Sequence, residues 1–370
     1  MQRWLIGGAL MILISTGTAS GSTSRLRALG NETRLLIDDS NVFVYPSTIV
    51  EYSEVIAEPF DNWAGALYGM KGKQGLGVMF NRPVPSIQRI NRVLFNRLGG
   101  AFAGLNVRPW VDVVYGVRVG EAGALGIGFS YAYDRNDVGD DKTSAKNADV
   151  ALGLSVKQRV DLAVNLNVQK FSSDIPRNGG LSYTGTSFGF EGRGTLLSGT
   201  SQLIPMVSVS AGTHDVDDAS FFNATGGIGI RVTPVESAEA LIGILVGGHS
   251  ETRTIEGVEV TDRQIALPRL IGAAEAGVGS VSARVGFERS AVLKTDQEIV
   301  DAGVEVGVVR SETRGFDTPF RIEFGLGFRF GSVTLDGVVE KDFFRDGPYL
   351  LGGNRHGGGF FSSATLTYGL

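Results

Sequence analysis

The stretch Phe320-Arg321-Ile322-Glu323-Phe324-Gly325-Leu326-Gly327-Phe328-Arg329-Phe330 decides the fold class. All its even-numbered positions are aromatic or aliphatic, and its odd-numbered positions are arginine, glutamate or glycine. Strict alternation over eleven residues gives a β-strand two chemically different faces, whereas a helix would mix the two sets.

The same alternation runs through much of the chain. It recurs in Val111–Val119, Leu125–Tyr133, Val160–Val168 and Val281–Phe287. Fourteen strand candidates can be counted between residues 107 and 370, most of them ten to thirteen residues long. Strands of soluble proteins average about 5–6 residues. A strand tilted across a bilayer needs about 9–11. The strand length therefore favours a membrane-spanning sheet.

The second face of these strands is made mostly of small residues. Glycine accounts for 53 of the 370 residues, and alanine, serine and asparagine supply most of the other positions on this face. Small side chains suit the inside of a curved sheet, and an apolar outer face suits lipid. Backbone groups in lipid must all be paired, which requires closure. We predict an all-β protein, a closed antiparallel transmembrane β-barrel of about 14 strands, within a range of 12–16; the alternative is a secreted soluble β-protein.

Composition excludes several functional classes. The formal charge of -5 argues against a nucleic-acid partner. The absence of cysteine excludes thiolate metal sites and disulfides, and three histidines are too few for a histidine-rich metal centre. We expect no cofactor and no metal. Gly185-Thr186-Ser187-Phe188-Gly189 matches the hydrolase nucleophile pattern but lies inside an alternating run, without the strand-to-helix turn that catalysis requires. An enzyme is not expected.

The amino terminus has the three-part layout of an export signal. Met1–Arg3 is positively charged, Trp4–Ile14 is apolar, and small residues follow, with cleavage expected after Ala19 or Ser20. The eleven apolar residues fall short of the roughly 20 that a spanning helix needs. We predict a cleaved signal peptide over residues 1–20.

With these features, residues 107–370 resemble bacterial outer-membrane β-barrel proteins of a porin-like or transporter-like kind. Phe361–Leu370 is similar to the carboxy-terminal signal that such barrels present to their insertion machinery, although it ends in leucine instead of the usual phenylalanine or tryptophan. Residues 38–46 resemble a segment near the start of some uncharacterised barrels. The resemblance implies the Gram-negative outer membrane as location, with outer-membrane lipid and the insertion machinery as partners.

Residues 21–106 precede the predicted barrel and are divided by charge. Asn31–Asn62 carries a balance of -6 and Lys71–Val111 one of +7. We hypothesise that the acidic part docks on the basic part as a plug or periplasmic cap; the alternative is two separate solvated stretches. Residues 63–81 are read as a hairpin or two further strands. The basic residues singled out are Arg82, Arg89, Arg92 and Arg97.

Charged residues of both signs occur on the face predicted to line the lumen. A mixed set predicts pairing between neighbouring strands, weak ion selectivity, or both. The candidates are Asp112, Arg118, Asp161, Glu191, Arg193, Arg231, Arg284, Glu288, Glu305, Arg321, Glu323, Arg329, Asp336 and Glu340.

Polar stretches rich in Asp or Gly, such as Asp134–Ser144 and Ser250–Gln264, predict loops. Long and short connections alternate, as in outer-membrane barrels, until Ser311–Thr318 and Gly331, which are both short. Either a strand boundary or the strand count is therefore in error there. We expect a channel or transporter for small or hydrophobic solutes. The alternative is a structural or adhesive barrel with a filled lumen and no transport.

Overall fold

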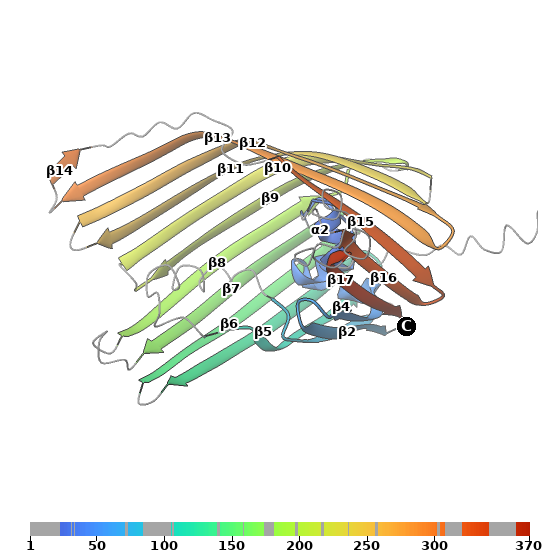
Figure 1. The fold of residues 1–370 in the computed structure, drawn as a ribbon, viewed down its shortest axis with the longest axis horizontal. Coiled ribbons are helices and arrows are strands. Elements are labelled where there is room, and N and C mark those ends of the chain that lie inside the picture. Colours follow the sequence, from blue (N-terminus) through green and yellow to red (C-terminus); the bar gives the residue numbers. More distant parts are fainter. Residues whose placement is uncertain are drawn as a thin grey trace, which may run out of the picture.

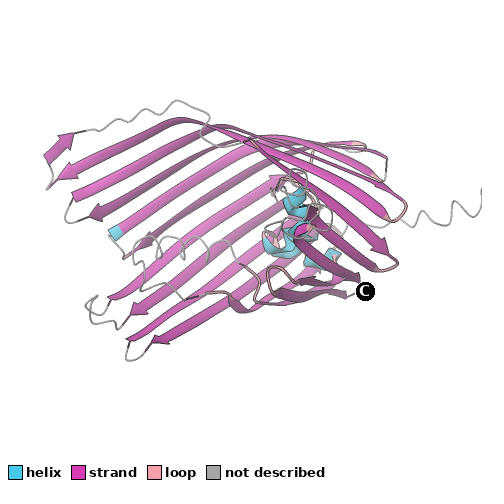
Figure 2. Cartoon of the chain, in the orientation of Figure 1, coloured by secondary structure: helices cyan, strands magenta, loops and turns pink. Residues whose placement is uncertain are grey.

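The computed structural model describes residues 23–370 except 31, 33, 71–72, 84–104, 106, 139–140, 158, 174–180, 197–198, 216–217, 236, 256–257, 302–303, 308–319 and 340–359. Most of the described residues lie in β-strands (Figure 2). Three short helical elements precede the strands: α2 (Thr23–Ala28), η1 (Asp39–Phe43) and η2 (Pro46–Glu51). None of the described helices has the length and apolar character needed to cross a bilayer.

Seventeen strands form one antiparallel sheet in the described residues. They are β1 (Ser53–Glu58), β2 (Trp63–Met70), β3 (Gln74–Phe80), β4 (Pro109–Val119), β5 (Gly123–Val138), β6 (Asp141–Val156), β7 (Val160–Ser173), β8 (Leu181–Gly194), β9 (Ser201–His214), β10 (Ala219–Val235), β11 (Ala238–Ile255), β12 (Val258–Val278), β13 (Val281–Asp301), β14 (Val304–Gly307), β15 (Arg321–Phe330), β16 (Val333–Val339) and β17 (Phe361–Gly369).

The sheet closes on itself. Strands that follow each other in the chain pair with each other, except β14 and β15, which both pair with β13, and β1 pairs with both β2 and β17. The closing seam runs from Glu54↔Gly369 to Ala57↔Leu366. In Figure 1 the strands form a tilted row that curves round to the carboxy-terminal strands, which are drawn in red. The prediction of a closed antiparallel barrel is confirmed.

The ring has sixteen strand positions, because β14 and β15 lie along the same edge of β13. The sequence pattern counts these two as separate strands, which explains why the predicted alternation of connections breaks near Ser311–Thr318. It also starts the barrel at residue 107, whereas the ring begins at Ser53 and includes β1, β2 and β3. Two of these strands correspond to the hairpin read at residues 63–81. The count of sixteen lies at the top of the predicted range.

The two ends of the barrel differ. At the end that holds the carboxy terminus, called here the short-turn end, the connections between the strands have two to six residues, as at Gly120, Gly279 and Gly331. These three glycines adopt φ near +63°, +62° and +63°, which other residues rarely do. The opposite end carries the two longest connections, at 81–108 and 340–360, and the far ends of β12 and β13, which are 21 residues each.

The two faces of the wall follow the alternation in the sequence. Apolar side chains exposed on the outside include Leu125, Ile127, Phe129, Ile242 and Ile244. Among these, Ile242 keeps 65 % of its surface exposed. Their neighbours in sequence point inward, where glycine and polar residues are common. The apolar stripe thus forms a continuous outer surface that only hydrocarbon can satisfy.

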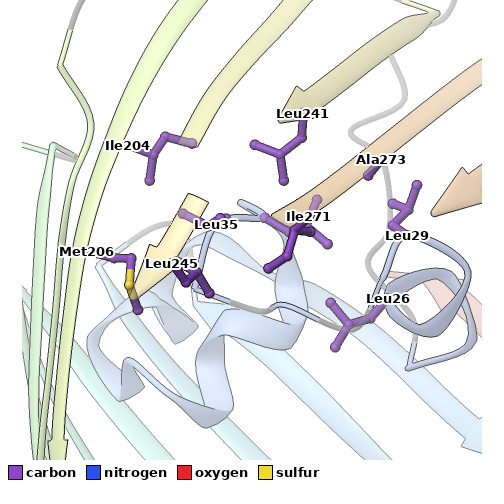
Figure 3. Packing of buried hydrophobic residues seen from close by; sticks show 10 residues of the cluster. Leu26, Leu29, Leu35, Ile204, Met206, Leu241, Leu245, Ile271 and Ala273 are labelled. Carbon is purple, nitrogen blue, oxygen red and sulfur yellow. The ribbon is translucent and has the colours of Figure 1, made fainter. Parts of the chain in front are cut away.

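The amino-terminal residues 23–51, called here the plug segment, lie inside the ring (Figure 1). Asp38 precedes η1 and its side chain accepts a hydrogen bond from the Ser40 backbone nitrogen, while the Asn41 side-chain oxygen accepts one from the Asp38 backbone nitrogen. One apolar cluster joins Leu26, Leu29 and Leu35 of the plug segment to wall residues such as Leu241 and Ile271 (Figure 3). A second cluster joins η1 and η2 to β1–β4.

Candidate functional site

The contact between the plug segment and the barrel wall depends on glycines. A Cβ atom on Gly126 would collide with the backbone of Pro46 and Ser47, and one on Gly153 would lie 2.8 Å from the Ser47 nitrogen. Leu35 lies in the same way 2.5 Å from the position of a Cβ on Gly243. All three glycines lie a few residues from the short-turn end. The plug segment therefore occupies that end, in the space that side chains would otherwise fill.

Arg25 of α2 is at the centre of the first of three ionic connections to the wall. Its guanidinium donates to Asp38 at 2.9 Å and to Glu275 of β12 at 2.7 Å. Glu275 also accepts from Arg284 of β13 at 2.9 Å, and Arg284 donates in turn to Asp336 of β16. Attraction by Glu275 and Asp38 outweighs burial and raises the pKa of Arg25. Positive and negative groups alternate along this row, so each buried charge has an opposite neighbour.

Arg193 of β8 makes the second connection. It donates to Asp161 of β7 at 2.8 Å, to the Leu36 carbonyl oxygen at 2.9 Å and to the Asn41 side-chain oxygen at 2.6 Å. Its guanidinium carbon lies 4.7 Å from the centre of the Tyr45 ring. Burial raises the pKa of Tyr45, which stays neutral. One wall arginine thus contacts the loop between α2 and η1, η1 itself and Tyr45, which directly precedes η2.

The third connection lies on the plug segment around residues 32–34. Arg34 donates to Glu191 of β8 at 2.8 Å, and Glu32 accepts from Arg269 of β12 at 3.0 Å. Glu32 and Glu191 together raise the pKa of Arg34 against the effect of its burial. Salt bridges therefore fasten the plug segment to β8 and to β12, four strands further round the ring.

The plug segment also contacts the closing seam. The Ser24 hydroxyl lies 2.7 Å from that of Ser363 in β17, and the Ser24 backbone nitrogen donates to Thr365. The Thr365 hydroxyl donates to Glu58 of β1. At the other side, the Ser47 hydroxyl of η2 lies 2.7 Å from that of Ser155 in β6. These contacts pin both ends of the plug segment.

The predicted lumen residues fall into two groups. Arg118, Asp161, Glu191, Arg193, Arg284, Glu288 and Asp336 lie in or next to the contacts with the plug segment; Arg118 pairs with Glu51 of η2, and Glu288 with Arg269. Four pair elsewhere: Asp112 with Arg82 and Ser130, Arg231 with Glu239, and Arg321 and Glu323 with each other. Arg329 is half-buried near the Gly331 turn. Glu340 and the side chain of Glu305 lie outside the described part.

The acidic part of the amino-terminal region engages the wall. Glu32 and Glu51 bind Arg269 and Arg118, which lie outside the basic stretch Lys71–Val111. From that stretch, Arg108 donates to the Asp61 carbonyl oxygen and Arg82 binds Asp112. Arg89, Arg92 and Arg97 lie outside the described residues, so docking on them stays a hypothesis.

Sequence reasoning missed Arg25, Glu275 and Arg269. The segment around Arg25 has no strand alternation that would have drawn attention to it. Glu275 and Arg269 lie in alternating stretches but were not singled out, and only their partners reveal their role. Among the described residues, no group of three or more His, Asp or Glu side chains is arranged to hold a metal ion.

The outer face is apolar, the inner face carries paired charges, and the described strands close into a ring. The fold is that of a bacterial outer-membrane β-barrel. No family model and no curated protein matches the chain.

Several solved barrels share a limited likeness of fold. The FrpB iron transporter of Neisseria meningitidis, in its F5-1 variant apoprotein form, aligns with a TM-score of 0.41 and 7 % identity, over 79 % of this chain and 62 % of its own. CdiB from Escherichia coli aligns with a TM-score of 0.42 and 8 % identity, over 86 % and 62 %. The siderophore receptor PirA from Acinetobacter baumannii gives 0.36 and 8 %, over 77 % and 61 %. The chain therefore spans about three fifths of the length of these proteins.

Proposed function

We propose that this barrel is a gated channel or transporter of the outer membrane for small or hydrophobic solutes, with the plug segment as its gate. The observation that carries the proposal is the plug segment itself, seated inside a ring of sixteen strands. Barrels of about 16–18 strands leave a water-filled channel when nothing occupies them. A segment fastened across one end of such a ring changes its permeability by moving.

The chemistry of the contact supports reversible docking. Arg25 and Arg34 connect the plug segment to the wall through hydrogen-bonded ion pairs, and Arg193 donates to the Leu36 carbonyl oxygen and the Asn41 side-chain oxygen. Water and lumen ions can replace such partners when the segment leaves, whereas a purely apolar contact would have to expose its surface. Buried ion pairs often stabilise a structure no more than apolar packing of the same volume would. Their use here is consistent with a contact that separates.

The orientation follows from the two ends of the ring. Outer-membrane barrels have short periplasmic turns and longer extracellular loops. The plug segment lies near the short turns, at the end that holds Leu370. It would then close the periplasmic exit, while the long hairpin β11–β12 and the far end of β13 form the extracellular wall.

Export and membrane insertion are part of the same proposal. Residues 1–20 act as a cleaved signal peptide, and Phe361–Leu370 is read by the insertion machinery. The apolar outer stripe supplies the contact with outer-membrane lipid. Edman sequencing of the membrane-extracted protein tests the cleavage, which we expect after Ala19 or Ser20.

A reversible covalent lock tests the gate. The native chain has no cysteine, and the Ser47 and Ser155 hydroxyls lie 2.7 Å apart, close to the sulfur separation of about 2.05 Å in a disulfide. The Ser47→Cys/Ser155→Cys double variant should therefore cross-link η2 to β6. In planar bilayers we expect low conductance when oxidised and at least wild-type conductance after reduction. The single variant Ser47→Cys is the control.

Ser24→Cys/Ser363→Cys provides an independent lock on α2, because those hydroxyls are also 2.7 Å apart. Equal conductance of oxidised and reduced protein in both lock pairs would exclude the plug segment as the gate. The alternative function is a structural or adhesive barrel, favoured by the near-complete burial of Arg25, Asp38 and Arg193. It predicts no conductance for wild type or for either lock pair in either redox state.

A further inference from the structure

Asp39 occupies an unusual position at the start of η1. Only 1 % of its surface is exposed, and neither carboxyl oxygen receives a hydrogen bond from a described donor. Its neighbour Asp38, by contrast, binds Arg25 and the Ser40 backbone nitrogen. Burying a carboxylate without a hydrogen-bond donor costs free energy, because the group loses its hydration and gains no hydrogen bond to replace it.

The groups that face Asp39 come from each element packed around it. Glu54 of β1 lies within hydrogen-bonding reach, Asp38 adds a second negative charge, and Arg25 of α2 supplies the positive one. Arg25 is already bound to Asp38 and Glu275. Tyr52, between η2 and β1, is held neutral because burial raises its pKa.

Two carboxylates cannot hydrogen-bond to each other, because an ionised carboxyl group only accepts. A bond between Asp39 and Glu54 therefore requires a proton on one of them. Shared in this way, the proton would give one oxygen of Asp39 a hydrogen-bond partner and remove one of two like charges. Glu54 belongs to the strand that closes the ring, where Glu54 pairs with Gly369. The bond would thus join the plug segment to the closing seam.

We propose that docking of the plug segment takes up one proton, shared by Asp39 and Glu54, so that the segment is held more firmly in acid and released more readily as the pH rises. This inference deepens the proposed function. Only the consequence of the proton uptake for transport rests on that function.

The direction follows from proton linkage. Burial, and then Glu54, raise the pKa of Asp39 well above its ordinary value. The docked state therefore binds more protons than the released state, in which the carboxyl is solvated with a pKa of about 4. This contribution to docking is complete below about pH 4 and is lost as the pH rises to the raised pKa. Over that interval the docking constant falls up to about tenfold per pH unit.

A thiol probe reports release directly. Val42 lies in η1 with no exposed surface, so Val42→Cys in the cysteine-free chain should react with a membrane-impermeant maleimide only after undocking. The labelling rate is divided by that of Glu121→Cys, in the exposed β4–β5 turn, to cancel the pH dependence of the thiolate. We expect this ratio to rise with pH by up to about tenfold per unit within the interval above.

Neutral isosteres identify the proton site. In the Val42→Cys background, Asp39→Asn supplies a hydrogen-bond donor to Glu54 and should keep the labelling ratio low and independent of pH. Glu54→Gln supplies a donor to Asp39 and should have the same effect. Glu51→Gln, in the adjacent η2, removes a carboxylate that pairs with Arg118 and should keep the pH slope.

The outcomes are separable. A ratio independent of pH in the Val42→Cys protein, or a slope that persists in both Asp39→Asn and Glu54→Gln, overturns the proton switch. Heat-modifiable gel migration verifies that each variant is folded, and the two isosteres substitute for each other if one is not. Labelling does not depend on conductance, so a failure of the disulfide-lock experiment leaves this test standing, and the reverse holds.

Discussion

The fit of the plug segment against bare glycine can be tested with a single methyl group. In Gly126→Ala the new Cβ would lie 2.5 Å from the Pro46 carbonyl oxygen, and closer still to the Pro46 carbonyl carbon and the Ser47 nitrogen. Comfortable contact needs about 3.5 Å, so η2 must retreat by about 1 Å. The obstacle is plug backbone and cannot rotate away. Overpacking of this kind costs about 1–3 kcal/mol.

That cost falls on the docked state alone, because the released segment does not meet the methyl group. With tenfold per 1.4 kcal/mol, the release equilibrium should increase about 5- to 150-fold. The assay is the labelling rate of Val42→Cys at fixed pH. Gly128→Ala is the matched control on the same strand and face: its Cβ would find its nearest atoms at 3.6 Å, an ordinary contact.

Alanine in place of glycine ordinarily strengthens a strand by roughly 0.5–1 kcal/mol. The expected increase in labelling is therefore opposite to the generic effect of the substitution. If Gly126→Ala labels no faster than Gly128→Ala, then η2 is not seated on β5 as described, and the gate loses its structural basis.

Two further predictions concern the inner and outer faces. Arg193→Met leaves Asp161 buried without its cation and should destabilise the barrel by about 3–5 kcal/mol. The loss should appear as a lower temperature for the heat-modifiable gel shift, and adding Asp161→Asn should recover part of it. An unchanged shift temperature would contradict the assigned contacts. Ile242→Arg places a charge on the most exposed residue of its apolar stripe and should cost about 2–4 kcal/mol of unfolding free energy in lipid vesicles; a cost under about 1 kcal/mol would mean that this face does not touch hydrocarbon.

Alternation in the sequence was a reliable guide to strands that face lipid on one side. Phe320–Phe330 contains β15, and Val160–Val168 lies within β7. The guide failed beyond the membrane, where both faces meet water and alternation fades. Ser250–Gln264, predicted as a loop, lies almost entirely in β11 and β12, because their ladder pairs polar residues such as Glu251 and Asp262.

Strand order was only partly predictable for a related reason. β1 is six residues long and too short for its pattern to stand out. β14 and β15 each alternate, and nothing in their sequence says that both lie on one edge of β13. Register across sequence-distant strands is needed to see it. The missing information is long-range pairing, which short-range periodicity does not contain.

For the charged interior, sequence reasoning found wall residues such as Arg193 and Arg284 because they lie on the polar face of alternating runs. It did not find the plug-segment residues that meet this interior. Arg25 and Asp38 look like ordinary surface charges in a polar stretch, and they became buried ion pairs only when the chain entered the ring. Arg193 reaches the Leu36 carbonyl oxygen across 157 positions of sequence.

The sequence by itself determined a closed sheet with an apolar exterior. Apolar side chains alternate with small or polar ones along the strands, and backbone groups in lipid must all be paired, which requires closure. Tertiary structure decided that the ring is filled at its short-turn end, and by which residues. A glycine in the sequence leaves space beside the backbone but does not show which residues fill it. Only the folded structure shows that Pro46, Ser47 and Leu35 occupy that space. The reason is that periodicity is a local property, whereas steric and ionic fit belongs to segments that meet in space.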